Sequence, residues 1–184
     1  VDFAAMKFDV GFDLRDQSGE TALMKAARGG HIEGVHMLIR RDNGRRDANQ
    51  ELQDHQKRTA LAHAILADQR EFLEAMVTTR TESYRTSATS WTPMPTLMSV
   101  DVLLLEDSEG RNGLQLLESH GFDDIAQQLR NRLRAARDEL TKNIEAGESD
   151  KLSLLFRWRS PLWRLFGETE KAESDLAESE RLKQ

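Results

Sequence analysis

The side chains that could carry chemistry in this sequence are five histidines and many carboxylates, and the chain has no cysteine. A protein metal centre needs three or four ligands at suitable spacing, and no pair of these histidines stands at such a spacing beside a third ligand. The chain also lacks a Gly-x-Ser-x-Gly turn, a glycine loop with a phosphate-binding lysine and a His-Glu-x-x-His motif. The carboxylates fall on predicted exposed helix faces, and their spacing singles out no acid–base pair. The sequence therefore predicts no enzyme, no cofactor and no metal site.

Two stretches gather cations instead. Residues 40–46 hold four arginines, which could contact phosphate or an acidic peptide, but neighbouring aspartates weaken their field and we favour a solvated turn. Residues 156–166 combine Trp158 and Trp163 with arginines and contain no acid. That composition suits a membrane interface or a docking surface. Because the end of a helical stack must also be covered, we favour a capping role for this stretch.

A third stretch, residues 78–99, is rich in serine and threonine and shows no helical period. Its hydroxyls are chemically suited to phosphorylation. Its apolar side chains either form a contact patch or fold back on the rest of the chain. The tryptophans at these two places are the candidate secondary contacts, Trp91, Trp158 and Trp163.

Composition limits the class of protein. The 184 residues are 38% hydrophobic and 32% charged, which is polar for a compact globule but natural for an elongated stack with a large surface. A net charge of −6 provides no basic field for nucleic acid, and no apolar run reaches the ~20 residues of a membrane span. The absence of cysteine fits a reducing compartment, so we expect a cytoplasmic protein. The chain begins without a signal peptide or an initiating methionine, which suggests a fragment of a longer protein.

The element that must position these side chains is a turn followed by two short helices, over residues 16–39. Gly19 in the turn is free to take a positive φ, and Thr21 is a suitable N-cap for the first helix. A glycine pair ending at Gly30 stops that helix. Apolar residues at helical spacing from position 32 to 39 predict the second helix. Such a unit cannot bury its apolar face alone, so it must stack on neighbours.

The same pattern recurs along the chain. A second unit covers residues 54–77, and a third, at 107–121, aligns residue for residue with the first. In the second unit Lys57 stands where the first has Gly19, and Asp68 stands where the first helix ends on a glycine. The chain is therefore built from internal repeats.

The first unit resembles an ankyrin repeat through the pattern Asp-x-x-Gly-x-Thr-Ala-Leu-x-x-Ala-Ala-x-x-Gly-His followed by Val-x-x-Leu-Ile. Ala22 and Met24 take the places of the usual proline and histidine, and the resemblance extends over roughly residues 10–156. It implies a protein-interaction module whose turn tips and exposed first-helix positions line a concave face. Carried over to this sequence, the implied partner-binding residues are Gln17, Ser18, Glu20, Met24, Arg28, His55, Gln56, Arg58, Ser108, Glu109, Arg111 and Gln115.

We therefore expect an all-α fold, an ankyrin-repeat-type helical solenoid with short hairpin turns and a C-terminal helical cap. Residues 1–13 would form a partial repeat or an N-terminal cap, and residues 14–156 the repeats. The expected units lie near 14–46, 52–80, 105–131 and 138–156, with an insertion loop at 78–101. Residues 157–184 would form a capping helix and an acidic tail.

Three further stretches bear on the type or the limits of the predicted secondary structure. The apolar run 100–105 could pair as a strand or pack on the helices. Residues 125–144 keep helical spacing without a glycine or proline, so either one long helix runs through or two helices meet near Arg134. Ser160-Pro161 is a helix-start signal and predicts a helix that begins there.

The predicted function is a scaffold or adaptor that binds a partner protein through the concave face, with no nucleic-acid partner and no integral membrane segment. Two alternatives remain at this point. One is a membrane-peripheral module that uses residues 156–166. The other is a regulatory or targeting segment of a larger protein, such as an enzyme or a bacterial effector.

Overall fold

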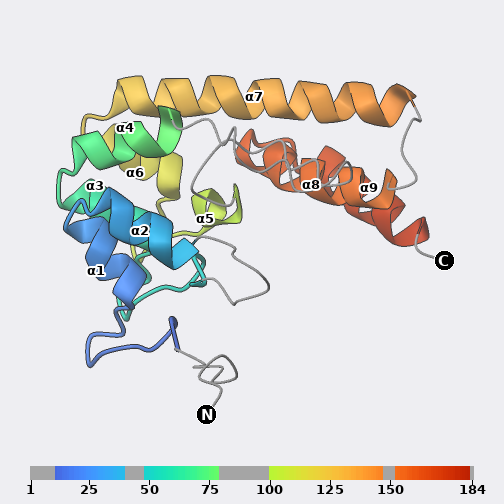
Figure 1. Ribbon diagram of the computed structural model, residues 1–184. Helices are drawn as coiled ribbons and strands as arrows, with labels where there is room; N and C mark the ends of the chain where they lie inside the picture. Colours follow the sequence, from blue (N-terminus) through green and yellow to red (C-terminus); the bar gives the residue numbers. More distant parts are fainter. Residues whose placement is uncertain (1–10, 40–47, 79–99, 147–151, 183–184) are drawn as a thin grey trace, which may run out of the picture.

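The computed structural model describes residues 11–39, 48–78, 100–146 and 152–182, and these residues form nine α-helices and no strand (Figure 1). The helices are α1 (Ala22–Arg28), α2 (Ile32–Ile39), α3 (Ala60–Leu66), α4 (Arg70–Thr78), α5 (Val100–Leu104), α6 (Gly113–Ser119), α7 (Asp123–Ala146), α8 (Leu152–Leu165) and α9 (Thr169–Arg181). The all-α expectation is confirmed over this part of the chain. None of these helices is long and apolar enough to cross a membrane.

The helices form pairs that stack on one another. The first helices of the pairs, α1, α3 and α6, pack in sequence, α1 on α3 and α3 on α6. Each also packs on its own second helix, α2, α4 or α7 (Figure 1). The leucine at the same position of each first helix is 97% buried, and these leucines are Leu23, Leu61 and Leu114. One apolar core therefore runs from unit to unit, as a repeat stack requires.

The first helices begin where the sequence predicts. Thr21, Thr59 and Asn112 occupy the N-cap positions, and each side chain accepts a hydrogen bond from the backbone N–H three residues later. These bonds satisfy a donor that every helix N-terminus leaves free. The cap thus fixes the start of the first helix in all three units.

Helix α7 settles one of the open alternatives. It is a single helix of 24 residues that passes through Arg134 without a break. It packs on α4 and α6 and then continues along α8 (Figure 1). The boundary expected between the units at 105–131 and 138–156 therefore falls inside one continuous helix. With neither glycine nor proline between residues 122 and 146, nothing in the local sequence interrupts it.

The C-terminal part differs from the prediction at one place. Helix α8 starts at Leu152 and runs through Pro161, so the prediction of a helix start at Ser160-Pro161 is wrong. Leu155 and Leu162 are both buried in the core from the two sides of the proline, and this packing keeps the helix continuous. Helix α9 then packs along α8, so much of the expected acidic tail is a helix of the cap.

The apolar run at 100–105 forms no strand: its residues 100–104 are the helix α5, which packs on α6 and α8. Several predictions lie outside the described residues. They are the partial repeat over its first ten residues, the arginine turn at 40–46, and residues 79–99 of the expected insertion loop, which include Trp91. The expected ends of that loop, at residue 78 and residues 100–101, belong to α4 and α5 instead.

Candidate partner-binding surface

The three turns that precede the first helices have the same hydrogen bonds. In each, one aspartate carboxylate accepts the backbone N–H groups of the residues two and four positions later, at 2.8–3.0 Å. These aspartates are Asp16, Asp54 and Asp107. The residue three positions after each aspartate has a positive φ, and it is Gly19, Lys57 or Gly110. Lys57 therefore adopts the conformation of the glycine that it replaces.

Successive turns are also tied to one another. A guanidinium N–H of Arg15 donates to the backbone carbonyl of Gln53 at 2.7 Å. The side-chain amide of Gln53 in turn donates to the backbone carbonyl of Glu106 at 2.8 Å. Between the first two turns, the backbone N–H of His55 donates to the carbonyl of Ser18 at 3.4 Å. The tips of the three turns are thus held in one row.

Most of the predicted partner-binding residues reach solvent from this row. The exposed ones are Gln17, Ser18, Arg28, His55, Gln56, Ser108, Glu109 and Gln115, and Arg58 and Arg111 are partly exposed. We call the exposed tip residues the turn-tip surface, and they are Gln17, Ser18, His55, Gln56, Ser108 and Glu109. The side chains on this surface are mostly polar and uncharged, so it suits hydrogen bonding more than ionic contact.

Two of the predicted residues are not on the surface. Met24 is 1% exposed, because its thioether accepts the N–H of Thr21 at 3.4 Å and completes the cap of α1. Glu20 is 7% exposed, because its carboxylate turns inward between the first and second units. A partner cannot reach either side chain in this conformation, so these two residues are removed from the predicted surface.

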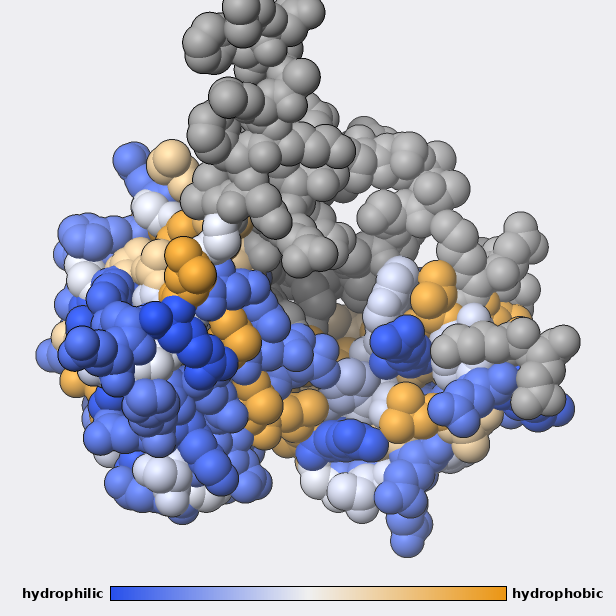
Figure 2. All heavy atoms as spheres, turned by 90° about the horizontal axis from the view of Figure 1, so that it is seen from below, coloured by the Kyte–Doolittle hydropathy of each residue, from blue (hydrophilic) through white to orange (hydrophobic). Residues whose placement is uncertain are grey.

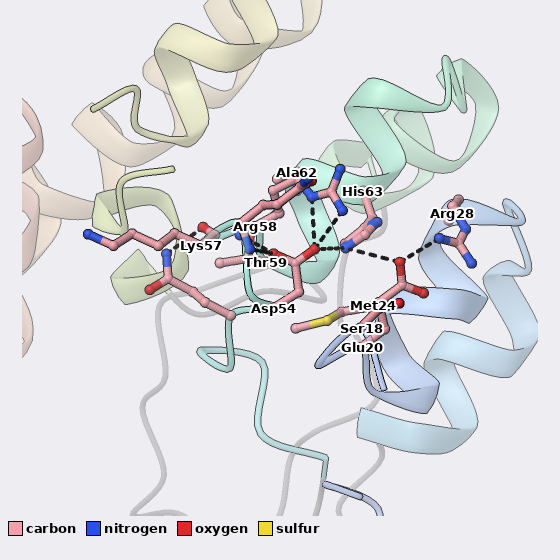
Figure 3. Close-up of polar contacts among 12 residues, drawn as sticks. Ser18, Glu20, Met24, Arg28, Asp54, Lys57, Arg58, Thr59, Ala62 and His63 are labelled. Atoms are coloured by element: carbon pink, nitrogen blue, oxygen red, sulfur yellow. Dashed lines mark hydrogen bonds and ion pairs between the residues drawn. The ribbon is translucent and has the colours of Figure 1, made fainter. Parts of the chain in front are cut away.

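Glu20 belongs to a buried polar network that the sequence analysis missed (Figure 3). His63 on α3 is 3% exposed, and its Nε2 lies 3.0 Å from Asp54 Oδ2 and 4.0 Å from Glu20 Oε1. Arg28 pairs with Glu20 at 2.6 Å. Arg58 pairs with Asp54 at 2.7 Å. Two carboxylates, two guanidinium groups and one imidazole therefore meet at the interface between the units.

The electrostatics of the network follow from burial and from these pairs. Burial opposes ionisation of Asp54, but the backbone N–H and guanidinium of Arg58 outweigh it, and the pKa of Asp54 lies below its ordinary value. The pKa of His63 is also lowered. Burial is the largest cause and the charge of Arg58 adds to it, against the opposing pull of Asp54 and Glu20. The ionised carboxylate and the neutral imidazole are thus the favoured forms.

The other two turn aspartates behave similarly. The hydrogen bond from Lys25 lowers the pKa of Asp16 to about 2. At Asp107 burial opposes ionisation, and the backbone and guanidinium donors of Arg111 outweigh it, so the pKa of that carboxyl is lowered as well. All three aspartates are therefore held as acceptors for the turns that they close.

Glu20, Asp54 and His63 offer ligand atoms within 4.8 Å of one another, which is close enough for a metal ion. Both carboxylates already pair with a guanidinium, however, and a cation between them would lie beside two arginines. The imidazole is also too deeply buried to meet a substrate. The arrangement therefore suits a structural polar contact between the first and second units better than a metal centre or a general base.

This network could not be found by motif because its members come from two different units. Glu20 closes the first turn, Asp54 opens the second, and His63 lies one helical turn into α3. The sequence signal that could have found it is the position of these residues within the repeat. Once the units are stacked, acidic residues in two neighbouring turns lie near the first helix of the second of those units.

The tryptophans of the cap have different surroundings. The indole N–H of Trp163 donates to Asp175 at 3.0 Å, and Arg159 holds the same carboxylate through two donors. Arg137 lies 4.8 Å from the Trp163 ring centroid, a cation–π distance. Trp163 is therefore fixed inside the cap, whereas Trp158 packs on the core and borders a groove described below.

Paired helices, repeated turns and a continuous core define a helical repeat protein. The ankyrin-repeat family model matches residues 3–86. This segment therefore consists of ankyrin repeats, and the all-helical described chain is consistent with an ankyrin-type helical solenoid. Comparison with curated proteins and with solved structures gave no match. Ankyrin repeats are in general protein–protein interaction modules.

Proposed function

We propose that this chain is a non-catalytic scaffold or adaptor that holds a partner protein on its turn-tip surface. The observation that carries the proposal is the row of three turns with identical internal hydrogen bonds and direct links between neighbours. Such a row presents side chains from three separate units, and little backbone freedom remains to be lost on binding. Preorganisation of this kind lowers the entropic cost of association.

The buried network supports the same proposal. Arg28 pairs with Glu20 within the first unit, and Arg58 pairs with Asp54 within the second. His63 lies between the two carboxylates, so the network connects the two units. The network thus forms a fixed support beneath the turn-tip surface, and the exposed side chains of that surface are left to select the partner. We further propose a reducing location such as the cytoplasm, in keeping with a chain that has no cysteine.

The test is an affinity capture with quantitative mass spectrometry. The surface variant carries Gln17→Arg, Gln56→Arg and Ser108→Arg, which change one exposed tip in each unit and break no side-chain hydrogen bond among the described residues. The arginines of the network are left intact, because their loss would disturb the stack. We expect a protein captured by the wild type to be lost by this variant.

The matched control carries Met37→Arg, Gln128→Arg and Ala135→Arg, three exposed positions on the second helices. It adds the same charge on α2 and α7. The control should keep the partner that the tip variant loses. A partner that is retained by the tip variant, or lost equally by both variants, would show that the turn-tip surface is not the binding site.

A further inference from the structure

An open groove of about 530 Å³ lies between α5 and α8, with α7 and α9 completing its walls. Its lining is mainly apolar, and it includes Leu104, Leu140, Leu154, Trp158, Pro161 and Leu176. Seen from below, apolar side chains (orange) form a band between the mostly hydrophilic repeat side and the α8–α9 side (Figure 2). The groove shares no residue with the turn-tip surface.

Two arginines on α8 give the groove a definite charge. Arg157 and Arg164 belong to its lining and are exposed. Neither side chain pairs with a carboxylate in the described part of the chain, and α8 itself contains no acidic residue. Asp101, the acidic residue of the groove lining, lies on the α5 wall and already takes part in another interaction. The rim therefore carries two positive charges available to a ligand.

The spacing of these residues suits a helix as the ligand. Leu154, Trp158 and Pro161 lie at positions i, i+4 and i+7, so they share one face of α8. The two arginines are seven residues apart, which places them about 10.5 Å from each other along the helix axis. Two carboxylates seven residues apart on another helix have the same separation. Apolar anchors at i, i+3, i+4 and i+7 are the usual contacts of a helix bound in a groove.

We propose that this groove binds an acidic amphipathic helix of a partner protein. The apolar stripe of that helix lies along Leu154, Trp158 and Pro161, and two of its carboxylates pair with Arg157 and Arg164. This surface is separate from the turn-tip surface, so the proposal does not depend on the partner proposed for the turns.

The probe is a synthetic helical peptide of about 15 residues, long enough to form a helix on binding. It carries leucines at the i, i+3, i+4 and i+7 positions, two glutamates seven residues apart beside that stripe, and a fluorescein label. A scrambled peptide of the same composition has no stripe, and a third peptide has lysines in place of the two glutamates. Binding to the whole chain is followed by fluorescence anisotropy.

The groove variant carries Arg157→Glu and Arg164→Glu, and the matched control carries Lys57→Glu and Lys142→Glu at exposed positions outside the groove. We expect the groove variant to bind the acidic peptide about tenfold more weakly than the wild type, and the control to bind within about twofold. The lysine peptide should bind the groove variant more tightly than it binds the wild type. Tighter binding of this peptide would also demonstrate that the groove variant is folded.

Three results would overturn the proposal. They are a wild type that does not bind the acidic peptide, a scrambled peptide that binds equally well, and equal losses in the groove and control variants. If circular dichroism shows that the two charge reversals unfold the cap, the milder Arg157→Gln and Arg164→Gln variants replace the groove variant. An acidic peptide that binds both of these as tightly as the wild type would also overturn it.

Discussion

At the scale of single residues, the two non-glycine residues with positive φ mark where the second unit departs from its neighbours. Lys57 has φ +58° and Asp68 has φ +55°, whereas the equivalent positions of the first and third units hold glycines. The left-handed conformation costs a residue with a side chain about 1–2 kcal/mol. The second unit thus has local strain that the other two units lack.

Replacing either residue by glycine should therefore stabilise the protein. We expect Lys57→Gly and Asp68→Gly each to raise the free energy of unfolding by about 0.5–1 kcal/mol, since glycine's greater freedom in the unfolded chain offsets part of the relieved strain. Urea titration measures the change. As the reverse control, Gly110→Ala should be destabilising, although a Cβ there meets no atom within 4 Å. A loss of stability in both glycine variants would contradict this explanation.

The buried imidazole predicts a pH dependence. The pKa of His63 is lowered from 6.5 in the folded chain, so the unfolded chain binds a proton that the folded chain excludes. Stability should then be complete above the unfolded value and fall as the pH drops below it. The ionisable groups around the imidazole are the carboxylates of Asp54 and Glu20 and the guanidinium groups of Arg58 and Arg28 that pair with them.

We expect His63→Gln to flatten the decline in stability between about pH 7 and pH 5, where the wild type loses stability as its unfolded state takes up the proton. Thermal unfolding at several pH values measures the slope. The control is His31→Gln, which removes an exposed histidine and should leave the wild-type slope in place. An unchanged slope in His63→Gln would place the titrating group elsewhere.

At the scale of elements, the sequence predicts helices well where local signals and packing agree. The N-caps Thr21, Thr59 and Asn112 lie at the starts of helices that the repeat alignment locates. The Ser160-Pro161 signal fails because it is only local. Leu155 and Leu162 draw both sides of the proline into one core, and this packing outweighs the hydrogen bond that proline cannot make.

Two helical glycines should respond in opposite ways to the same substitution. At Gly113, the first residue of α6, a Cβ would lie 3.0 Å from Leu61 Cδ2 and 3.3 Å from the backbone of Leu103. Gly113→Ala should therefore lower the free energy of unfolding by about 1–3 kcal/mol through overpacking between α3, α5 and α6. Denaturant titration is the measurement, and Gly113→Val should be worse still.

The comparison is Gly34 in α2, where an added Cβ would lie 3.5 Å from the Cβ of His31 and 3.9 Å from the Cβ of Ala26, which is ordinary van der Waals contact. Gly34→Ala should raise stability by about 0.5–1 kcal/mol, because alanine favours the helix over the unfolded chain. Equal effects at both glycines would mean that the close approach of α6 to its neighbours does not limit the side chain at position 113.

At the scale of the whole molecule, the repeat pattern predicts the stack but not the contacts across it. The spacing of Leu23, Leu61 and Leu114 is enough to place one core through three units. The approach of Glu20 to His63 depends on how far one unit is rotated on the next, which no local pattern encodes. The groove likewise depends on how α8 lies against α5, two segments that are far apart in the sequence.

Helix α7 has a further consequence for how the molecule engages its partners. Twenty-four residues of unbroken helix are about 36 Å long, and α7 spans from the repeats to α8 and α9 (Figure 1). Because α7 packs on α4 and α6 at one end and along α8 at the other, it fixes where the groove lies relative to the repeats. Leu104 of the groove and Ser108 of the turn-tip surface are only four residues apart, so the two surfaces approach each other at the third unit. A single ligand with an epitope for each surface would therefore gain effective concentration with a short linker, and a long flexible linker would weaken that gain.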